Sequence, residues 1–272
     1  MNLRRIEQLR KLIQFYGLRS LVSGFEYLIM TKIPTLSLFK ILYLPNGFKI
    51  LIPGQQDYLR GILSNYGEIY VQGIYRRHHR YVPDKGEVVL DIGAFIGLYT
   101  LDASFRVGDE GVVYAIEPNS LSFHLLTMNV GLNKLKNIEA LPVAFGRSRG
   151  QQCMSYTGLP IFFSLYLNDN LAKQRVMVWR LDDFVSFKRL SRIDIAKIDA
   201  EGAELDILIG ASSTLERAII DRLVIEGHKL ILNKVVYKTQ QLVSILSCYG
   251  YAIDGIYDID AYSSIIYARH HR

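Results

Sequence analysis

The sequence predicts an α/β fold, a doubly wound sheet of seven mostly parallel strands with helices on both faces. From Glu87 onward, short apolar runs alternate with segments of helical length. Each run is apolar at consecutive positions, as expected of strands covered on both faces of a parallel sheet. The last two runs are joined by a short connection, which predicts an antiparallel pair that closes the sheet.

Each element follows from its own local pattern. Apolar runs bounded by Gly, Pro, Asn or Asp indicate strands, and longer segments with helical apolar spacing indicate helices. The expected strands are residues 88–93, 111–116, 138–145, 193–198, 223–226, 251–257 and 263–268. The expected helices are residues 98–107, 121–132, 203–217 and 235–249. Residues 146–188 break the alternation, and we expect an antiparallel excursion there.

Residues 1–85 are expected to form an extension that precedes the α/β domain of residues 86–272. Residues 1–31 have the spacing of an amphipathic helix, Asn46–Gly47 predicts a β-hairpin, and short helices are expected within residues 57–81. Basic residues interrupt the first apolar stretch, which argues against a secretory signal. No stretch reaches the roughly 18 to 20 apolar residues that span a bilayer. We expect the first helix to pack on its own domain, and peripheral contact with a membrane is the alternative.

The composition is that of a globular protein with a moderate positive charge. Half of the residues are hydrophobic, the formal net charge is +6 and the pI is about 9.1. The basic runs Arg76–Arg80 and Arg269–Arg272 are interpreted as solvated surface charge. Cys153 and Cys248 lie far apart and predict neither a disulfide framework nor a zinc site. The expected location is therefore a reducing compartment, the cytoplasm.

A turn containing glycine links the first expected strand to the first helix. Gly93 and Gly97 bracket this turn, where glycine permits a positive φ and a close approach of ligand to backbone. The free N–H groups at the start of the helix face any anion placed there. A methionine carboxylate and a dinucleotide pyrophosphate both meet this description. Such a turn also serves simply to reverse the chain in many α/β proteins.

Two carboxylates near this turn separate the alternatives. Asp91 is placed to receive an ammonium group, which S-adenosyl-L-methionine has and a nicotinamide dinucleotide lacks. Glu117, at the end of the second strand, is placed to accept both ribose hydroxyls. The Gly-x-Gly-x-x-Gly pattern is incomplete, because Phe95 and Leu98 stand at its second and third glycine positions. The combination predicts a site for S-adenosyl-L-methionine.

The segment after Glu117 contributes to the same expected site. Pro118 and Asn119 are placed to flank the adenine, although Asn119 would equally serve as the N-cap of the next helix. The full set of residues expected to bind the cofactor is Asp91, Gly93, Ala94, Phe95, Gly97, Glu117, Pro118, Asn119 and Ala144.

A second acidic motif follows the fourth strand. Open α/β sheets bind ligands beyond the carboxyl ends of their strands, so Asp199 is expected beside the transferable methyl group. Asp199, Glu201 and Glu204 place three carboxylates within six residues, which is costly unless they are solvated, capped or used. For Glu204 we favour the role of a first-turn acid that interacts with the helix dipole.

Five segments together resemble the FkbM family of S-adenosylmethionine-dependent methyltransferases. The resemblance covers about residues 60–230, and its last acidic motif is far more specific than the glycine turn. The sequence departs from the family pattern at Phe95, where Asn is usual, and at Ala200, where Val is usual. The matching segments are Asp91–Thr100, Glu117–Asn119, Leu181–Phe184, Lys197–Glu204 and Glu226–His228.

The resemblance implies a class I methyltransferase fold and methyl transfer, usually to a hydroxyl oxygen of a sugar, glycan or other small metabolite. Such a displacement depends on positioning and gains further from a base that removes the hydroxyl proton. The candidate catalytic residues are Asp199 and His228, with Glu201 and Glu226 in the surrounding acid cluster. A divalent cation held by Asp199, Glu201 and Glu226 is the alternative; we expect no obligatory metal.

Other functions remain as alternatives. A tRNA or other nucleic-acid methyltransferase on the same fold is compatible with the positive charge, but no RNA-binding module is visible and we expect no nucleic-acid partner. A non-catalytic scaffold that retains the fold is disfavoured by the intact Asp91, Glu117 and Asp199. A dehydrogenase is disfavoured by the missing glycines. The sequence does not predict the oligomeric state.

Overall fold

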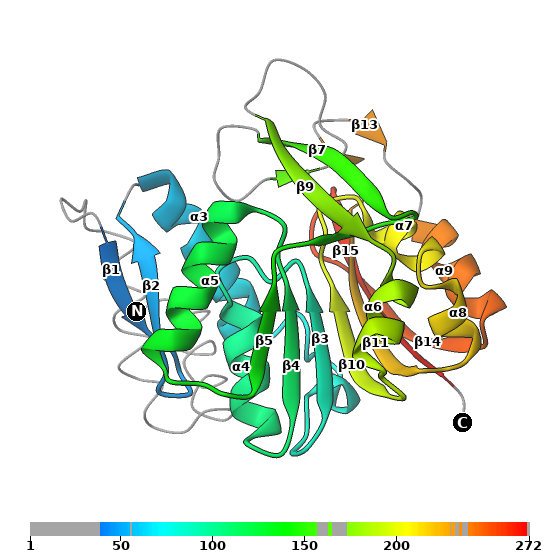
Figure 1. Cartoon of the computed structure of the whole chain (residues 1–272), viewed down its shortest axis with the longest axis horizontal. Coiled ribbons are helices and arrows are strands. Elements are labelled where there is room, and N and C mark those ends of the chain that lie inside the picture. Colours follow the sequence, from blue (N-terminus) through cyan, green and yellow to red (C-terminus); the bar gives the residue numbers. More distant parts are fainter. Residues whose placement is uncertain are drawn as a thin grey trace.

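A seven-stranded sheet forms the centre of the computed structural model, which describes residues 39–54, 56–156, 163–164, 173–228, 230–231, 234–235 and 239–270 (Figure 1). The order of its strands is β14-β15-β11-β10-β3-β4-β5. Neighbouring strands from β11 to β5 pair in parallel, and β15 is antiparallel to both of its neighbours. The strands are β3 (Val88–Ile92), β4 (Val112–Ile116), β5 (Ile138–Leu141), β10 (Ile193–Ile198), β11 (Ile220–His228), β14 (Tyr251–Asp258) and β15 (Ser263–His270).

Alternate residues of the same strands point into two separate hydrophobic cores, one on each face of the sheet, as a sheet covered on both faces requires. In β3, Val89 belongs to one core and Leu90 to the other. The first core is shared with α4 (Leu98–Val107) and α5 (Ser120–Leu132). The second is shared with α6 (Leu181–Lys188), α7 (Glu204–Ile209), α8 (Ser212–Glu216) and α9 (Thr239–Cys248). The predicted doubly wound fold, with its antiparallel closing pair, is confirmed.

The predicted third strand is wrong in one respect, because residues 138–145 form two strands in two sheets. Pro142 follows β5, and the chain then enters β6 (Ala144–Phe145), which pairs with β9 (Lys173–Trp179). With β7 (Gly150–Tyr156) and β8 (Phe163–Ser164) these strands form a four-stranded sheet of order β6-β9-β7-β8. Since β7 pairs antiparallel with both β8 and β9, this sheet is the expected excursion. It lies above the carboxyl ends of the central strands (Figure 1).

Two predicted helices are shorter than expected. The helix predicted over residues 203–217 is divided at Gly210, where an added Cβ would lie 2.1 Å from the carbonyl oxygen of Gly146. The chain therefore needs glycine at this point, and α7 and α8 form on either side of it. The helix predicted from residue 235 begins at Thr239, because Lys234–Val235 form strand β13, which pairs with β12 (Leu230–Ile231).

The described part of the extension packs on the same domain. The predicted hairpin is present as β1 (Phe39–Tyr43) and β2 (Lys49–Pro53), which pair across Asn46–Gly47. Asn129 of α5 and Asn133, the C-cap of this helix, accept hydrogen bonds from backbone N–H groups of β2 at 2.6 and 2.8 Å.

The hairpin is followed by the helix α3 (Gln56–Tyr66), the π-helical segment η1 (Gly67–Gln72) and the 3₁₀ turn η2 (His79–Tyr81). These match the short helices expected within residues 57–81. The helix expected over residues 1–31 lies outside the described residues, and the boundary at residues 85 and 86 stays a prediction. Within the described part of the chain, no helix is both long and apolar enough to cross a bilayer.

Candidate active site

The glycine turn after β3 lies directly against the end of β10. Gly93 has a φ of +76°, and an added Cβ would lie 1.7 Å from the carbonyl oxygen of Asp199. Asp199 N in turn donates a hydrogen bond to Ile92 O at 3.0 Å. Glycine is therefore required at position 93 for close contact with the chain's own backbone, and this contact joins the two predicted motifs. Gly97 has a φ of +98°, and a Cβ added there would lie 2.7 Å from Cδ1 of Leu126 in α5.

Glu117 points from the end of β4 toward this turn. Its carboxylate accepts hydrogen bonds from Phe95 N and Asn119 N, each at 2.8 Å. Burial raises the pKa of Glu117 to about 7, and these two backbone donors oppose the rise only in part. A carboxylate accepts about four hydrogen bonds, so Glu117 retains capacity for two further donors. A ribose diol would supply them.

Phe95 occupies the left-handed region, with a φ of +52°. Few residues other than glycine adopt this conformation, and Asn tolerates it better than bulky residues do. The family's usual Asn fits the backbone at this position, whereas Phe adopts it with strain. Glu201 has a φ of +48°, so both predicted motifs contain a residue in this region. Such strain is concentrated at functional sites.

Asp91 and Lys197 form a buried ion pair beneath the turn. Asp91 is fully buried, accepts a hydrogen bond from Thr100 at 2.6 Å and lies 3.1 Å from Lys197 Nζ. Lys197 also donates to Gly93 O at 2.8 Å and lies 3.6 Å from Asp199 Oδ2. Burial lowers the pKa of Lys197, but Asp91 and Asp199 raise it more. Asp91 therefore holds a lysine that bridges the two motifs, while its contact with a cofactor ammonium group stays a prediction.

The carboxylates at the ends of β10 and β11 converge on one tyrosine. Tyr75 Oη lies 3.0 Å from Asp199 Oδ2 and 2.5 Å from Glu226 Oε2. Tyr75 comes from the connection between η1 and η2, ahead of the whole parallel sheet. The pKa of Glu68 in η1 is raised, first by burial and second by the negative charge of the nearby Asp199. The extension thus forms one side of the acid cluster.

His228 is held at the end of β11 by a fully buried glutamate. His228 Nδ1 lies 2.9 Å from Glu204 Oε1, which also accepts from Ala200 N at 3.0 Å and Gly202 N at 3.1 Å. Glu204 is therefore more than a first-turn acid, because it fixes both the loop after β10 and the imidazole. The other ring nitrogen, Nε2, lies 3.7 Å from Glu201 and 3.9 Å from both Asp199 and Glu226.

The density of negative charge changes the protonation of this cluster. Burial, followed by the charge of Asp199, raises the pKa of Glu226 to about 8. Burial raises the pKa of Glu201 to about 7. Burial lowers the pKa of His228, but the negative charges of Glu201 and Glu204 raise it by more. The net pKa therefore lies well above the ordinary value of 6.5. The neighbouring carboxylates therefore favour the protonated form of His228, and its role as a general base stays a prediction.

The cluster also offers atoms of the types that bind metal ions. One carboxylate oxygen each from Asp199 and Glu226 and a ring nitrogen of His228 lie within 4.8 Å of one another. This set differs from the one considered in the sequence, because His228 stands in place of Glu201. The expectation that no metal is obligatory stays a prediction.

Two other residues expected to bind the cofactor have structural roles. Asn119 Oδ1 accepts from Ser122 N at 2.9 Å, so Asn119 caps α5. Ala144 belongs to the second sheet and packs with Val176 and Val178, so it does not end a strand of the central sheet. The adenine contacts proposed for Pro118 and Asn119 stay predictions.

Sequence reasoning missed Tyr75, Lys197 and Gln174. Lys197 lies within the quoted acidic motif, and its position inside a buried strand was a usable signal, since buried lysines are almost always paired. Gln174 of β9 donates to Pro118 O at 3.2 Å and accepts from Asn119 Nδ2 at 3.2 Å, which links the excursion to the segment after β4. No local pattern distinguishes Tyr75 from the chain's other tyrosines.

Comparison with known proteins identifies the class of this domain. The family model described as "Methyltransferase FkbM domain" matches residues 91–253, more than half of the 272 residues. The chain belongs to the FkbM methyltransferase family, as the motifs predicted, and S-adenosyl-L-methionine is the cofactor of such domains. The free acceptor capacity of Glu117 beside the glycine turn fits this cofactor.

Curated relatives are similar to parts of the chain. "Methyltransferase 1" of Beauveria bassiana is 27% identical over 165 residues, which cover 53% of this chain and 65% of the relative. The "AMB antimetabolite synthetase AmbE" of Pseudomonas aeruginosa is 24% identical over 250 residues, covering 77% of this chain and 11% of that protein. The chain thus spans less than two thirds of the length of either relative.

Solved structures with a similar fold include two that hold S-adenosylmethionine. Fibrillarin of Aeropyrum pernix, with natively bound S-adenosyl-L-methionine, is 14% identical, with 85% of this chain and 94% of that chain covered and a TM-score of 0.44. TYW2 of M. jannaschii in complex with AdoMet is 16% identical, with 87% of each chain covered and a TM-score of 0.44. The fold class itself follows from the strand order of the central sheet.

Proposed function

We propose that the chain transfers the methyl group of S-adenosyl-L-methionine to a hydroxyl oxygen of a sugar, glycan or other small metabolite. The observation that carries this proposal is the direct contact between the glycine turn and Asp199. The turn and Glu117 bind the cofactor on one side of this contact. The carboxylates of Asp199 and Glu226 accept hydrogen bonds from the acceptor on the other side.

When bound, the cofactor supplies a methyl group on a positively charged sulfur, which is open to attack by an oxygen nucleophile. Asp199 would orient the acceptor hydroxyl and take its proton as the C–O bond forms and the S–CH3 bond breaks, with S-adenosylhomocysteine as the leaving group. Such a base contributes about 10²- to 10⁴-fold to the rate. His228 is held in place by Glu204, and its Nε2 faces Glu201, Glu226 and Asp199 at 3.7 to 3.9 Å. Lys197 fixes Asp199 relative to the glycine turn.

The test combines ligand binding with a search for acceptors. S-adenosylhomocysteine is expected to raise the melting temperature, because a ligand that binds only the folded state stabilises it. Labelled cofactor is then offered with hydroxylated metabolites and glycans, in the presence of EDTA or of Mg²⁺. Transfer that survives EDTA supports the metal-free mechanism, and transfer that requires Mg²⁺ assigns the orienting role to a cation. Absence of any thermal shift at millimolar ligand would contradict the cofactor assignment.

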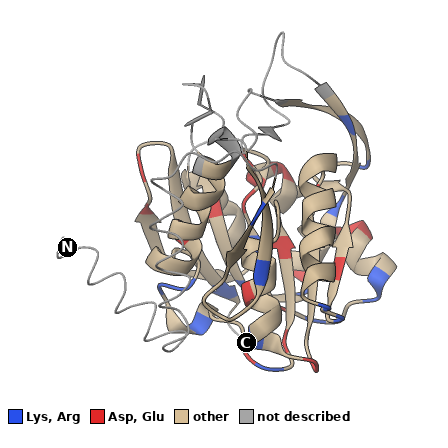
Figure 2. Cartoon of the chain, turned by 90° about the vertical axis from the view of Figure 1, so that its left-hand side faces the viewer, with Lys and Arg blue, Asp and Glu red and all other residues tan. Residues whose placement is uncertain are grey.

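Methylation of a nucleic acid is the second candidate, and the arrangement of basic residues within the described part of the chain disfavours it. In the ribbon of Figure 2, the described Lys and Arg residues are distributed over several elements. Arg76, from the predicted basic run, is buried and pairs with Asp102 at 3.0 Å. An RNA-binding surface instead needs basic side chains gathered on one exposed face. Salt-sensitive binding of RNA at physiological ionic strength would promote this candidate over ours.

A further inference from the structure

Tyr75 lies outside the segment that matches the methyltransferase family, yet its hydroxyl reaches the two carboxylates of the proposed acceptor site. The match begins at residue 91, and Tyr75 precedes it in the connection between η1 and η2. The residue is 2% exposed, so its hydroxyl is withdrawn from bulk water. Any role of Tyr75 in methyl transfer rests on the proposed function of this site.

One phenolic proton serves two carboxylates. The oxygen of Tyr75 lies 2.5 Å from Glu226 Oε2 and 3.0 Å from Asp199 Oδ2, and a hydroxyl has a single proton to donate. When both carboxyl groups are ionised they repel each other, and a donor placed between them offsets part of this repulsion. Burial, followed by the charges of Asp199 and Glu226, raises the pKa of Tyr75 well above 10, so the hydroxyl keeps its proton.

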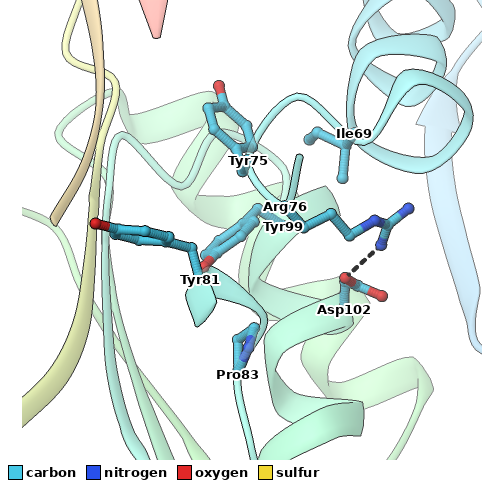
Figure 3. A pocket seen from close by; sticks show the side chains of 7 residues that line it. All are labelled: Ile69, Tyr75, Arg76, Tyr81, Pro83, Tyr99 and Asp102. Atoms are coloured by element: carbon cyan, nitrogen blue, oxygen red, sulfur yellow. Dashed lines mark hydrogen bonds and ion pairs between the residues drawn. The ribbon is translucent and has the colours of Figure 1, made fainter. Parts of the chain in front are cut away.

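The ring of Tyr75 is fixed from several sides. It packs edge-on against Tyr99 with ring centroids 5.5 Å apart, and Lys197 Nζ lies 5.4 Å from its centroid. The next residue, Arg76, is anchored to Asp102 at 3.0 Å. Figure 3 shows the hydroxyl of Tyr75 pointing away from this ion pair. The cavity beside the ring is small, about 10 Å³.

We propose that Tyr75 is a positioning residue of the active site: its hydroxyl holds Asp199 and Glu226 at a fixed separation for the acceptor hydroxyl. The extension therefore completes the site, and the domain matched by the family model does not contain the whole acceptor-binding machinery. Tyr75 acts through the two carboxylates and does not itself touch the reacting oxygen.

The test compares Tyr75→Phe with Tyr99→Phe. Both variants remove one hydroxyl from neighbouring buried rings, but among the described residues the hydroxyl of Tyr99 has no hydrogen-bond partner. Tyr75→Phe is expected to lower kcat about 10- to 100-fold, with S-adenosylhomocysteine affinity and melting temperature close to those of Tyr99→Phe. Tyr99→Phe is expected to keep the kcat of the unaltered protein. A purely structural role would lower the melting temperature of Tyr75→Phe and leave its kcat unchanged.

A second measurement tests the contact without relying on turnover. In protein labelled with ¹³Cζ-tyrosine, the Tyr75 resonance is the one that disappears in Tyr75→Phe. The Tyr99 resonance is the one that disappears in Tyr99→Phe. Asp199→Asn and Glu226→Gln are each expected to shift the Tyr75 resonance and leave that of Tyr99 in place. An unshifted Tyr75 resonance, or equal kcat in the two tyrosine variants, would overturn the inference. If S-adenosylhomocysteine binds and the resonance shifts but no acceptor is methylated, the proposed reaction fails and the contact stands.

Discussion

The two sides of the candidate site are built in different ways. The cofactor side is formed mainly by backbone. It consists of the turn at Gly93 and Gly97 and of the backbone N–H groups that donate hydrogen bonds to Glu117. The acceptor side is formed by charged side chains, of which Asp199 and Glu226 come from adjacent strands and Tyr75 from the extension. Backbone shape is specified by a few consecutive residues, whereas the acid cluster exists only after distant segments have folded together.

This difference indicates which side is free to vary. The turn tolerates little change at Gly93, whatever the ligand, because an added Cβ there would lie only 1.7 Å from the carbonyl oxygen of Asp199. The acid cluster depends on matched partners, such as Glu204 with His228, and a change in one partner alters the charge of the others. We therefore expect substitutions on the cofactor side to affect folding and affinity, and those on the acceptor side to affect turnover.

The sharpest separation is expected from Asp199→Asn. The amide cannot take the acceptor proton, so kcat should fall about 10²- to 10⁴-fold, while the dissociation constant for S-adenosylhomocysteine should change by less than about threefold. Steady-state kinetics and calorimetry measure the two effects. The control is Asp206→Asn, an acid of α7 that pairs with the exposed Arg147 at 2.9 Å. Full activity in Asp199→Asn would exclude this residue as the base.

The second separation concerns stability at two glycines. Gly93→Ala forces a positive φ on alanine and a clash with Asp199 O, and should cost about 3 kcal/mol of unfolding free energy or prevent folding. Gly131→Ala is the matched control, because no atom lies within 4 Å of its added Cβ in α5. It should stabilise the protein by about 0.5 to 1 kcal/mol. Urea unfolding of both variants checks the pair, and a mild effect at Gly93 would show that the turn can relax.

The sequence predicts the cofactor side better than the acceptor side, for a physical reason. Strand ends, the glycine turn and Glu117 are set by patterns of neighbouring residues, and the sheet order brings them together without further information. The two motifs could likewise be expected to meet, since the carboxyl ends of parallel strands share one edge.

The predictions that differ from the structure depend on contacts between distant segments. Pro142 stands where the chain leaves β5 for a second sheet, and the predicted helix over residues 203–217 is divided at Gly210, which packs against the backbone of Gly146. The protonation of His228 depends on Glu204 and Glu201, which are 24 and 27 positions away in sequence. Tyr75 is 151 positions from Glu226, and no local pattern links them.

A third prediction separates the sides through affinity. Glu117→Ala removes the carboxylate that we expect to accept the ribose hydroxyls, so S-adenosylhomocysteine should bind about 10- to 100-fold more weakly. Isothermal titration calorimetry measures this change. The control is Glu139→Ala, at the neighbouring strand β5, which should leave affinity unchanged. Equal affinities in both variants would remove the ribose assignment from Glu117.

The last prediction concerns the pH dependence of stability without ligand. Glu117, Glu201 and Glu226 have folded pKa values of about 7, 7 and 8, against 4.5 as the ordinary value. The folded state therefore binds more protons than the unfolded state between pH 4.5 and 8, and stability falls as pH rises through this window. His228 acts in the same direction above pH 6.5, because its folded pKa is also raised.

Urea unfolding in EDTA should therefore show a loss on the order of 1 to 3 kcal/mol between pH 5.5 and pH 8. Glu226→Gln, which carries no titrating carboxyl, should flatten this slope, whereas Asp206→Asn should not. The cofactor side contributes only Glu117 to the slope, so Glu117→Gln should remove a smaller part of it than Glu226→Gln does. Stability that stays level or rises with pH over this range would show that the acid cluster is more solvated than its burial implies, and that the two sides differ less in electrostatics than their architecture indicates.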